Sequence, residues 1–305
     1  MIEKLGRYRI TGELGKGAGG VVYSAIDPET GAEVALKALP TSDFGLDRAA
    51  LLERLKREAE STAKLDHPNI VKVTGLEQEA GGRYFLTMEM VKGRTLEHGL
   101  RNQEPFAPKQ VAEMISMAAA ALDYAHGSGM VHRDVKPANL MIIAGGGLKV
   151  MDFGAVKLLD QEQKMQLTRA GTTIGSPHYI SPEQLMGGEV DGRSDQFSLA
   201  VIAYELLVGR KPFQAEAVAL VMFQIATEKH PAPHSIRPEL PAALSAVFDR
   251  GLAKKREERY ESCSDFARDL IAALQVDRPK QSRLWWIVAA AVVAIAAIVF
   301  FLTRS

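Results

Sequence analysis

The sequence predicts an α+β protein made of two lobes or two domains, a smaller β-rich part followed by a larger and mainly helical one. With 305 residues, the chain is longer than a typical small domain and long enough to bury a sizeable core. Strand-forming residues separated by turn residues prevail up to about residue 91, and apolar residues at helical spacing prevail after it. This change of periodicity predicts the boundary between the two parts.

The composition excludes several classes of protein. The chain is 47% hydrophobic and 24% charged, with 37 basic and 37 acidic residues, so we expect a globular protein and no nucleic-acid partner. The single cysteine, Cys263, cannot form an intrachain disulfide, which fits a reducing compartment. The first ten residues lack the basic start and apolar core of a secretory signal, so we expect the folded part to stay in the cytosol.

The first lobe is predicted to contain five strands and one helix. Turn residues separate the strands, among them the segment 27–31 and the pair Gly81-Gly82, which read as hairpin connections. The strands are expected at 8–14, 21–26, 32–39, 71–77 and 83–90, and the helix at 46–65.

The second lobe is predicted to be helical. Apolar residues recur at helical spacing in five segments, which proline and glycine separate. These segments are 108–126, 195–208, 215–228, 240–253 and 263–274.

The segment 284–302 reads LWWIVAAAVVAIAAIVFFL and contains no charged residue. As a helix it would be roughly 28 Å long at about 1.5 Å per residue, enough to cross a bilayer. A buried core helix is the alternative, but core helices rarely lack a polar position on every face. We therefore expect a transmembrane helix here, with 276–283 as a juxtamembrane linker and 303–305 as a short tail.

Basic residues set the expected orientation of this helix. Arg278, Lys280 and Arg283 precede it, which favours a cytoplasmic side for the folded part and a single-pass anchor in the plasma (inner) membrane. Ala290 and Ala294 have small-xxx-small spacing, through which two copies could associate as a homodimer, although an alanine-rich helix shows this spacing by chance as well.

A glycine-rich segment lies between the first two predicted strands. Gly15 to Val22 reads GKGAGGVV and fits the pattern G-x-G-x-x-G-x-V, in which glycines let the backbone approach phosphate oxygens. The same glycines could simply close a tight hairpin. A dinucleotide-binding site would need a helix after the third glycine, whereas Val21-Val22-Tyr23 continues as a strand.

A lysine near the end of the third predicted strand is a candidate phosphate ligand. Lys37 follows three apolar residues in the segment VALK, and a charge facing a cleft needs a carboxylate partner. The helix at 46–65 offers Glu53, Glu58 and Glu60. At about 100° per residue, Glu58 lies roughly 45° from the apolar direction of the helix, while the other two lie beyond roughly 150°. Glu58 is therefore the expected partner, the alternative being a solvated glutamate at the edge of the apolar stripe.

The segment HRDVKPAN, from His132 to Asn139, is followed after a glycine-rich turn by Asp152-Phe153-Gly154. With these motifs in this order, the chain resembles the eukaryotic-like (Hanks-type) protein kinases, and among them the bacterial membrane-anchored serine/threonine kinases. The resemblance implies the bilobal protein kinase fold for residues 8–275, with an N-lobe of about 8–91 and a C-lobe of about 92–275.

The resemblance also implies a role for each motif residue in phosphoryl transfer. Asp134 would orient the substrate hydroxyl and accept its proton, and Lys136 would neutralise the transferred phosphoryl group. Asn139 and Asp152 would bind Mg²⁺, which Mn²⁺ could replace. A lysine two residues after the catalytic aspartate is typical of kinases that act on serine and threonine, so protein Ser/Thr hydroxyls are the implied substrates.

Further positions follow from the same resemblance. Met88 would line the back of the adenine pocket, and Glu89 to Val91 would form the hinge whose backbone meets the base. Glu183 would pair with Arg259, and Asp195 would hold the backbone of the catalytic loop. The implied ATP-binding residues are Leu14, Gly15, Gly17, Gly20, Val22, Ala35, Lys37, Met88, Glu89 and Val91.

Between Gly154 and Ser181 lies the implied activation segment. Thr168, Thr172 and Thr173 are candidate phosphosites, where a phosphate could pair with Arg133 and order the segment through charge-assisted hydrogen bonds. Autophosphorylation at these sites and a role in membrane-associated signalling are therefore expected.

Two other functions compete with that of an active kinase. A pseudokinase would bind ATP or a partner without transferring phosphate, but degraded motifs would mark it, and Lys37, Asp134, Asn139 and Asp152 are all present. A small-molecule phosphotransferase on a related fold is disfavoured by Lys136 and by the segment 175–183, which resembles a platform for peptide substrates.

Overall fold

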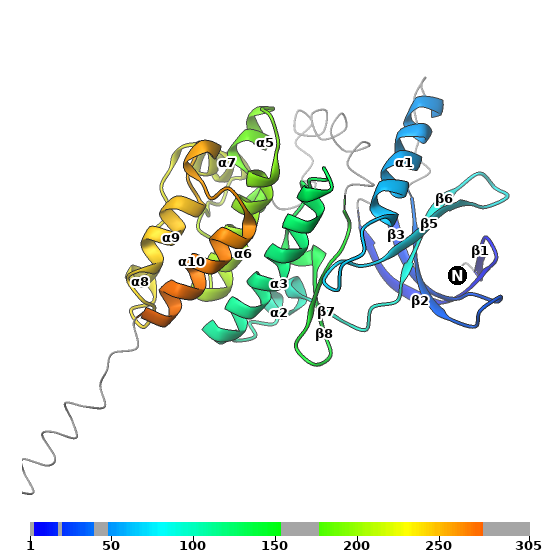
Figure 1. The fold of residues 1–305 in the computed structure, drawn as a ribbon, viewed down its shortest axis with the longest axis horizontal. Coiled ribbons are helices and arrows are strands. Elements are labelled where there is room, and N and C mark those ends of the chain that lie inside the picture. Colours follow the sequence, from blue (N-terminus) through cyan, green and yellow to red (C-terminus); the bar gives the residue numbers. More distant parts are fainter. Residues whose placement is uncertain (1–2, 18–19, 40–47, 154–176, 277–305) are drawn as a thin grey trace, which may run out of the picture.

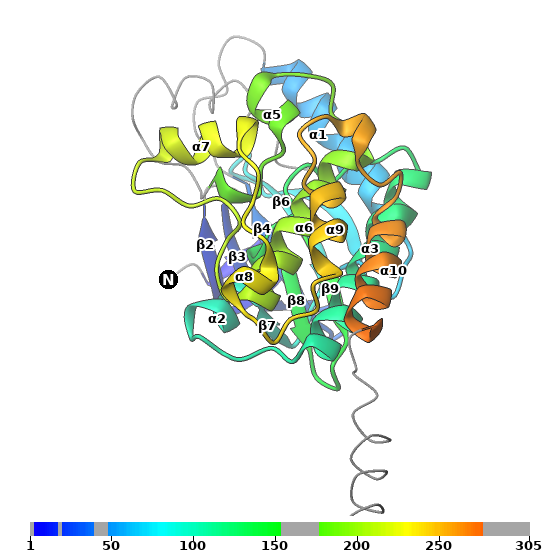
Figure 2. The same cartoon turned by 90° about the vertical axis from the view of Figure 1, so that its left-hand side faces the viewer.

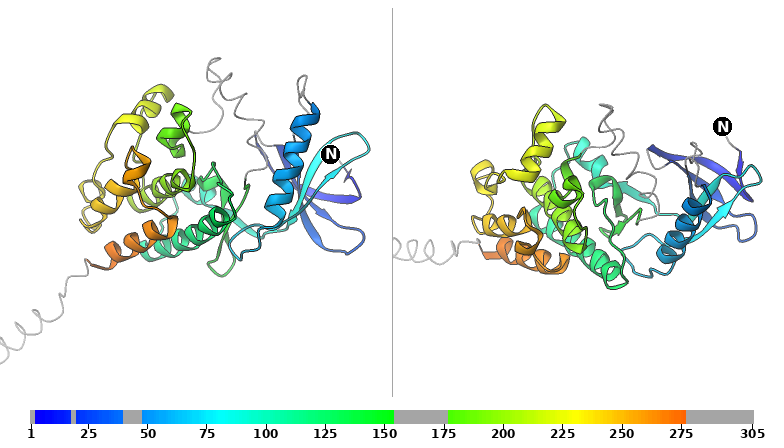
Figure 3. Two further views of the ribbon diagram at one scale, coloured as in Figure 1. Left: turned by 45° about the horizontal axis from the view of Figure 1, so that its top comes forward. Right: turned by 90° about the horizontal axis from the view of Figure 1, so that it is seen from above.

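The computed structural model describes residues 3–17, 20–39, 48–153 and 177–276. Figure 1 shows two lobes side by side. One is the β-rich N-lobe, which contains a long helix, and the other is the helical C-lobe; the two views of Figure 3 show the same division. The predicted two-lobed α+β architecture is confirmed.

The N-lobe is built on a six-stranded antiparallel sheet with the order β1-β2-β3-β4-β6-β5. Helix α1 packs beside β5, the last strand in that order. The elements are β1 (Lys4–Leu5), β2 (Tyr8–Gly17), β3 (Gly20–Ile26), β4 (Glu33–Ala38), α1 (Arg48–Ala63), β5 (Val73–Gln78) and β6 (Tyr84–Glu89). All five predicted strands are present, with β1 as an addition.

Side-chain alternation divides the N-lobe core into two clusters on opposite faces of the sheet. Leu36 and Phe85 lie in one cluster, and their chain neighbours Ala35 and Leu86 lie in the other. The second cluster also contains Ala59 of α1, so it fills the space between sheet and helix. This is the face on which the site is built.

The C-lobe is organised around α6 (Gly192–Val208), in which every residue from Ser194 to Val208 is buried. A helix buried over nearly its whole length needs neighbours on every side, and α3, α9 and α10 pack against it (Figure 2). The helices are α2 (Leu96–Arg101), α3 (Pro108–Gly127), α5 (Pro182–Met186), α6, α7 (Val218–Thr227), α8 (Pro233–Ile236), α9 (Leu244–Gly251) and α10 (Cys263–Val276). The five predicted helices correspond to α3, α6, α7, α9 and α10.

A second sheet was not predicted. It has the order β7-β8-β9, with β7 (Gly93–Thr95), β8 (Leu140–Ile143) and β9 (Leu148–Val150), and it lies between the lobes in Figure 1. The described residues also form three short 3-10 turns, η1 (Pro137–Asn139), η2 (Pro177–Tyr179) and η3 (Arg256–Glu258). The small sheet adjoins the catalytic-loop segment, because β8 begins directly after Asn139.

Within the described ranges, no helix is both long enough and apolar enough to cross a bilayer. The predicted transmembrane segment 284–302 and most of its linker lie outside these ranges, as do the candidate phosphosites Thr168, Thr172 and Thr173.

Candidate active site

The loop from His132 to Asn139 joins α3 to β8, and hydrogen bonds to α6 hold it in place. The side chain of Asp195 on α6 accepts the backbone N–H groups of His132 (2.8 Å) and Arg133 (2.7 Å). The predicted role of Asp195 as the holder of this loop is thus confirmed. Arg133 has φ +65°, a left-handed conformation that residues with a side chain rarely adopt, so these hydrogen bonds stabilise a strained backbone.

His132 fixes the other side of the loop. Its buried ring lies 2.8 Å from the carbonyl oxygen of Met151 through Nε2, and Nδ1 accepts the backbone N–H of Asp134 at 3.2 Å. The ring also packs on that of Phe153, with 4.6 Å between centroids. The catalytic-loop segment and the segment of Asp152 are therefore locked to each other through one imidazole.

Three predicted site residues meet at the end of this loop. Lys136 Nζ lies 2.9 Å from Asp134 Oδ2, and the side-chain amide of Asn139 donates to the backbone carbonyl (2.9 Å) and to Oδ2 (3.3 Å) of Asp134. About a third of the Asp134 side chain and of the Lys136 side chain is exposed, so a substrate can reach both. The carboxylate is oriented by two donors while remaining accessible.

On the N-lobe side, Lys37 Nζ lies 2.8 Å from Asp152 Oδ2. The lysine side chain is 7% exposed and the aspartate side chain 36%, so the cation is buried and its partner faces the cleft. Asp152 has φ +61°, a second strained position in the site. A buried lysine is stabilised by such a paired carboxylate, which compensates for lost hydration.

The orientation predicted for Glu58 agrees with the structure, but its predicted ion pair does not appear. Glu58 is half-buried on α1, whereas Glu53 and Glu60 are exposed. Among the ion pairs of the described residues, Lys37 pairs with Asp152 and not with Glu58.

A pocket opens beside this ion pair. Its wall combines Lys37 and Asp152 with apolar side chains from both sides of the cleft, namely Ala59, Val71, Val73, Leu86, Met88 and Phe153, together with Thr62. A mainly apolar cavity with one charged end suits a flat aromatic base that carries an anionic tail.

Of the residues predicted to bind ATP, Lys37 and Met88 line this pocket, and three others belong to or pack against the apolar cluster beside it. Ala35 and Met88 belong to the buried cluster of which the pocket wall is part, and Val22 and Val91 pack against that cluster. Leu14 is 55% exposed on β2. The carboxylate of Glu89 forms an ion pair with Lys149 (2.6 Å), so this side chain braces the hinge.

The glycine-rich segment forms the tip of the β2–β3 hairpin, where Gly15 pairs with Val22 and Gly17 pairs with Gly20. Gly20 has φ +115°, and a Cβ atom there would lie 1.9 Å from the carbonyl oxygen of Ala38. Only glycine fits this position. The hairpin tip therefore depends on Gly20 for its shape.

The donor set fits a hard divalent cation. Asp152 offers a partly exposed carboxylate, and Asn139 directs its amide N–H groups to Asp134, so its amide oxygen is the end suited to a metal ion. Carboxylate and amide oxygens are the ligands that Mg²⁺ prefers, usually together with phosphate oxygens and water.

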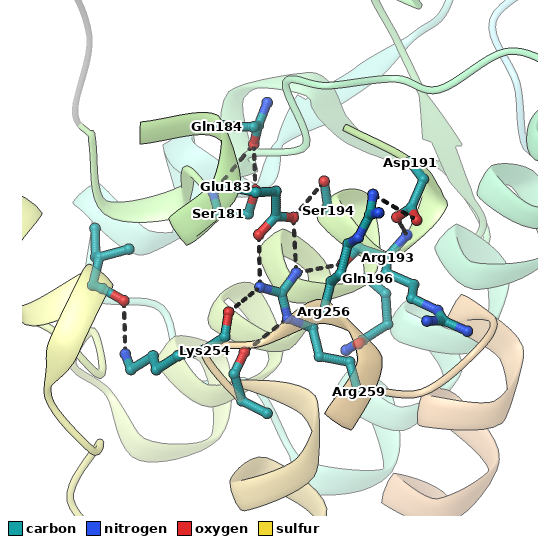
Figure 4. A network of polar contacts seen from close by, with 12 residues as sticks. Ser181, Glu183, Gln184, Asp191, Arg193, Ser194, Gln196, Lys254, Arg256 and Arg259 are labelled. Atoms are coloured by element: carbon teal, nitrogen blue, oxygen red, sulfur yellow. Dashed lines mark hydrogen bonds and ion pairs between the residues drawn. The ribbon is translucent and has the colours of Figure 1, made fainter. Parts of the chain in front are cut away.

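Beyond the catalytic loop, α5 is anchored by a buried ion pair (Figure 4). The guanidinium of Arg259 binds both carboxylate oxygens of Glu183, at 2.9 and 2.7 Å, as predicted. Burial opposes the charge on Glu183, but hydrogen bonds from Arg259 and Ser194 outweigh it and lower its pKa to about 2. Gln184, next on α5, donates to the carbonyl oxygen of Arg133 at 2.8 Å. The anchored helix thus supports the catalytic loop directly.

Several site residues were not identified from the sequence. Val71, Val73 and Leu86 line the pocket but look like ordinary strand core, and only the strand register reveals that they face the cleft. His126, which contacts Asp195 at 2.8 Å, gives no local signal because its partner is 69 positions away. Such contacts depend on helix packing.

Comparison with known proteins agrees with this geometry. Residues 8–285 match the protein kinase domain family. The serine/threonine-protein kinase PknB of Mycobacterium tuberculosis is 38% identical over 282 residues, which cover 91% of this chain and 44% of that protein. The probable serine/threonine-protein kinase SCO3848 of Streptomyces coelicolor is 37% identical over 276 residues, covering 88% and 40% respectively.

A third relative, the probable serine/threonine-protein kinase PknB of Lactococcus lactis, is 35% identical over 279 residues, covering 91% of this chain and 44% of that protein. The chain thus spans less than half the length of these relatives. Since the family match extends over most of the sequence, this chain belongs to the protein kinase family.

Proposed function

We propose that this protein is a serine/threonine kinase that transfers the γ-phosphoryl group of ATP to serine and threonine hydroxyls of proteins. The observation that carries the proposal is the convergence, at one cleft, of the Lys37–Asp152 ion pair with the cluster of Asp134, Lys136 and Asn139. Relatives named as serine/threonine-protein kinases support the same activity.

Each residue then has a physical task. The apolar pocket lined by Met88, next to Ala35 in the same buried cluster, takes the adenine, and Lys37 offers a fixed cation to the phosphates. Asp152 and Asn139 would hold Mg²⁺, which supplies positive charge against the phosphate oxygens. The Asp134 carboxylate, held by Asn139 and Lys136, orients the substrate hydroxyl and accepts its proton. Lys136 stabilises the charge on the group in transfer.

The test is to incubate the full-length chain with Mg²⁺, γ-labelled ATP and a generic protein substrate, beside an Asp134→Asn variant. We expect label on serine and threonine residues with the wild-type protein and a trace with the variant. Equal labelling by both proteins, or label confined to tyrosine, would contradict the proposed activity.

We also propose that the protein is anchored by residues 284–302 and phosphorylates its own activation segment. The uncharged composition of 284–302 supports the anchor, and the position of Thr168, Thr172 and Thr173 between Gly154 and Ser181 supports the phosphosites. Membrane fractions should contain the full chain but not a chain ending at 276. A triple alanine variant at the three threonines should lose activity, and unchanged activity would refute this regulation.

Association of two chains through Ala290 and Ala294 would favour phosphorylation between copies. Bulky substitutions at both alanines should then lower both self-association and autophosphorylation in membranes. If neither changed, the two alanines would have no role in association.

A further inference from the structure

Three side chains that offer different metal-binding atoms meet where α3 and α10 pack together. Asp123 and His126 lie one helical turn apart on α3, and Cys263, 140 positions after Asp123, is the first residue of α10. A carboxylate oxygen, a ring nitrogen and the sulfur atom of these residues all lie within 4.8 Å of one another. Among the residues that the structure describes, no other group of three or more potential metal ligands is as close.

The spacing of these atoms suits a tetrahedral zinc ion. Zinc binds nitrogen and oxygen at about 2.0–2.2 Å and sulfur at about 2.3 Å, so neighbouring ligand atoms lie about 3.3–3.7 Å apart. Nδ1 of His126 lies 3.7 Å from Oδ1 of Asp123. Because no pair in the group exceeds 4.8 Å, the sulfur atom of Cys263 needs to shift by at most about 1 Å to complete the set.

The ring of His126 is already oriented as in zinc sites. Its Nε2 lies 2.8 Å from Oδ2 of Asp195, a side chain that is 1% exposed. Histidines that bind a metal ion almost always donate their other ring N–H to a carboxylate or a carbonyl group, which fixes the ring and makes it a better ligand. With Nε2 engaged in this way, Nδ1 is the nitrogen that a metal ion can use.

A glycine leaves space beside this nitrogen. A Cβ atom built on Gly192, the first residue of α6, would lie 2.7 Å from Nδ1 and 3.0 Å from Cε1 of His126. Real Cβ atoms do not come so close to other atoms. Any other residue at position 192 would therefore fill the edge of the ring that carries Nδ1, and the glycine keeps it free of side-chain atoms.

Asp123 can bind a metal ion without giving up its present contacts. Its carboxylate accepts the backbone N–H groups of Cys263 (2.9 Å) and Ser264 (2.8 Å), which hold it against the start of α10. An ionised carboxylate has about four acceptor sites, so two hydrogen bonds leave room for a metal ion. The Asp123 side chain is 24% exposed, whereas Cys263 is fully buried, so an ion and a water molecule can enter from the side of Asp123.

The charges also balance. A divalent ion bound by one carboxylate, one thiolate and one neutral imidazole has no net charge, which lowers the cost of burying it. The mixed set of sulfur, nitrogen and oxygen donors is typical of zinc and unlike the oxygen ligands that Mg²⁺ prefers.

We propose that Asp123, His126 and Cys263 bind one zinc ion, with water as the fourth ligand, and that the ion fastens the start of α10 to α3. Binding forms bonds from zinc to a carboxylate oxygen, to Nδ1 and to Sγ, and the protons that the sulfur and Nδ1 carried pass to solvent. This site is separate from the Mg²⁺ site proposed for the cleft, and it does not depend on kinase activity.

The test uses the full-length chain without an affinity tag, freed of metal by dialysis against a chelator. Co²⁺ serves as the probe, because it occupies zinc sites and its bond to a thiolate gives an absorption band in the near ultraviolet. We expect this band to saturate at one equivalent of Co²⁺ and to disappear when Zn²⁺, which binds such sites more tightly, is added. A large excess of Mg²⁺ should leave the band unchanged.

Variants then assign the ligands by competition for Zn²⁺ with a chromophoric chelator. Losing a partner of a ligand already costs about 10- to 100-fold in metal affinity, so Cys263→Ser and His126→Ala should each lose about 100-fold or more. Gly192→Ala keeps all three ligands but fills the space beside Nδ1, and it should lose about 10-fold or more. His234→Ala, which removes an exposed histidine on α8, is the matched control and should bind Zn²⁺ as the wild type does.

Stability gives a second readout. Zn²⁺ should raise the urea unfolding midpoint of the metal-free wild type and leave that of Cys263→Ser unchanged, because a ligand stabilises only the state that binds it. A wild type without the Co²⁺–thiolate band, or with the same affinity for Zn²⁺ as Cys263→Ser and Gly192→Ala, would overturn the proposal. Since metal binding is measured without ATP or substrate, that result would leave the proposed kinase function untouched.

Discussion

Replacing Arg259 with leucine should destabilise the C-lobe strongly at neutral pH. The guanidinium is fully buried and donates to both oxygens of Glu183 and to three backbone carbonyls, those of Ala253 (2.8 Å), Arg193 (3.1 Å) and Lys254 (3.0 Å). Leucine retains apolar volume but leaves the Glu183 carboxylate buried without its cation. Breaking a buried pair in this way costs about 3–5 kcal/mol of unfolding free energy.

The pKa of Glu183 gives an independent magnitude. It falls from 4.5 to about 2 in the folded protein, and each unit corresponds to about 1.4 kcal/mol, so the charged form contributes roughly 3 kcal/mol. Because the folded pKa is the lower one, this stability is present above about pH 4.5 and is lost as the pH falls toward 2. The difference between wild type and Arg259→Leu should therefore be largest near pH 7 and shrink below about pH 4.5.

The assay is urea unfolding followed by far-ultraviolet circular dichroism at pH 7 and at pH 3. Arg256→Leu is a matched control, because Arg256 lies nearby but its ion-pair partners Glu189, Asp191 and Glu257 are exposed or nearly so. The control should stay close to wild type. A loss below about 1 kcal/mol for Arg259→Leu at pH 7, or a loss independent of pH, would refute the reasoning.

Three further outcomes follow from the site. Lys37→Met should lower kcat by about 10²-fold or more, because it removes the cation paired with Asp152, and steady-state phosphorylation of a protein substrate measures this. Gly20→Ala should destabilise the hairpin by about 1–3 kcal/mol and weaken ATP binding, measured by calorimetry, since its Cβ would strike Ala38. Burial opposes the charge on His126, but hydrogen bonds with two neighbouring carboxylates outweigh it and raise its pKa from 6.5 to about 9 in the folded protein. The stability that this residue contributes is therefore present below about pH 6.5 and is lost as the pH rises through about 9. The urea unfolding midpoint of the metal-free wild type should fall between about pH 7 and 10, and that of His126→Ala should fall much less.

The elements that sequence patterns predicted are those with long, uninterrupted periodicity. The helix at 108–126 corresponds to α3 within one residue, and five strands were placed within a few residues of their true ends. The sheet of β7, β8 and β9 was missed because its strands are three or four residues long and show no alternation. Its pairing depends on how the catalytic loop folds back between the lobes.

The candidate site, too, could be predicted from the sequence only in part. Motif order identified Asp134, Lys136, Asn139 and Asp152, and a helical wheel singled out Glu58 as the half-buried glutamate of α1. The wheel could not identify the partner of Lys37, because helical periodicity gives the direction of a side chain and not its distance from another element.

Residues that act through others were the hardest to find. The contact of His126 with Asp195, and the space that Gly192 leaves for it, depend on how closely α3, α6 and α10 approach. Neither residue lies within a motif that binds phosphate or metal. Only the packed structure shows that Asp195 binds the backbone of the catalytic loop and that His126 contacts Asp195 in turn.

The most direct test of the central claim compares ATP affinity with the rate of phosphoryl transfer in wild type and Asp134→Asn. Asp134 lies outside the wall of the nucleotide pocket, so the variant should bind Mg²⁺-ATP within about twofold of wild type while transferring phosphate about 10²- to 10⁴-fold more slowly in a single turnover. Equal single-turnover rates in the two proteins, or no transfer by the wild type, would contradict the assignment of this cleft as a kinase active site.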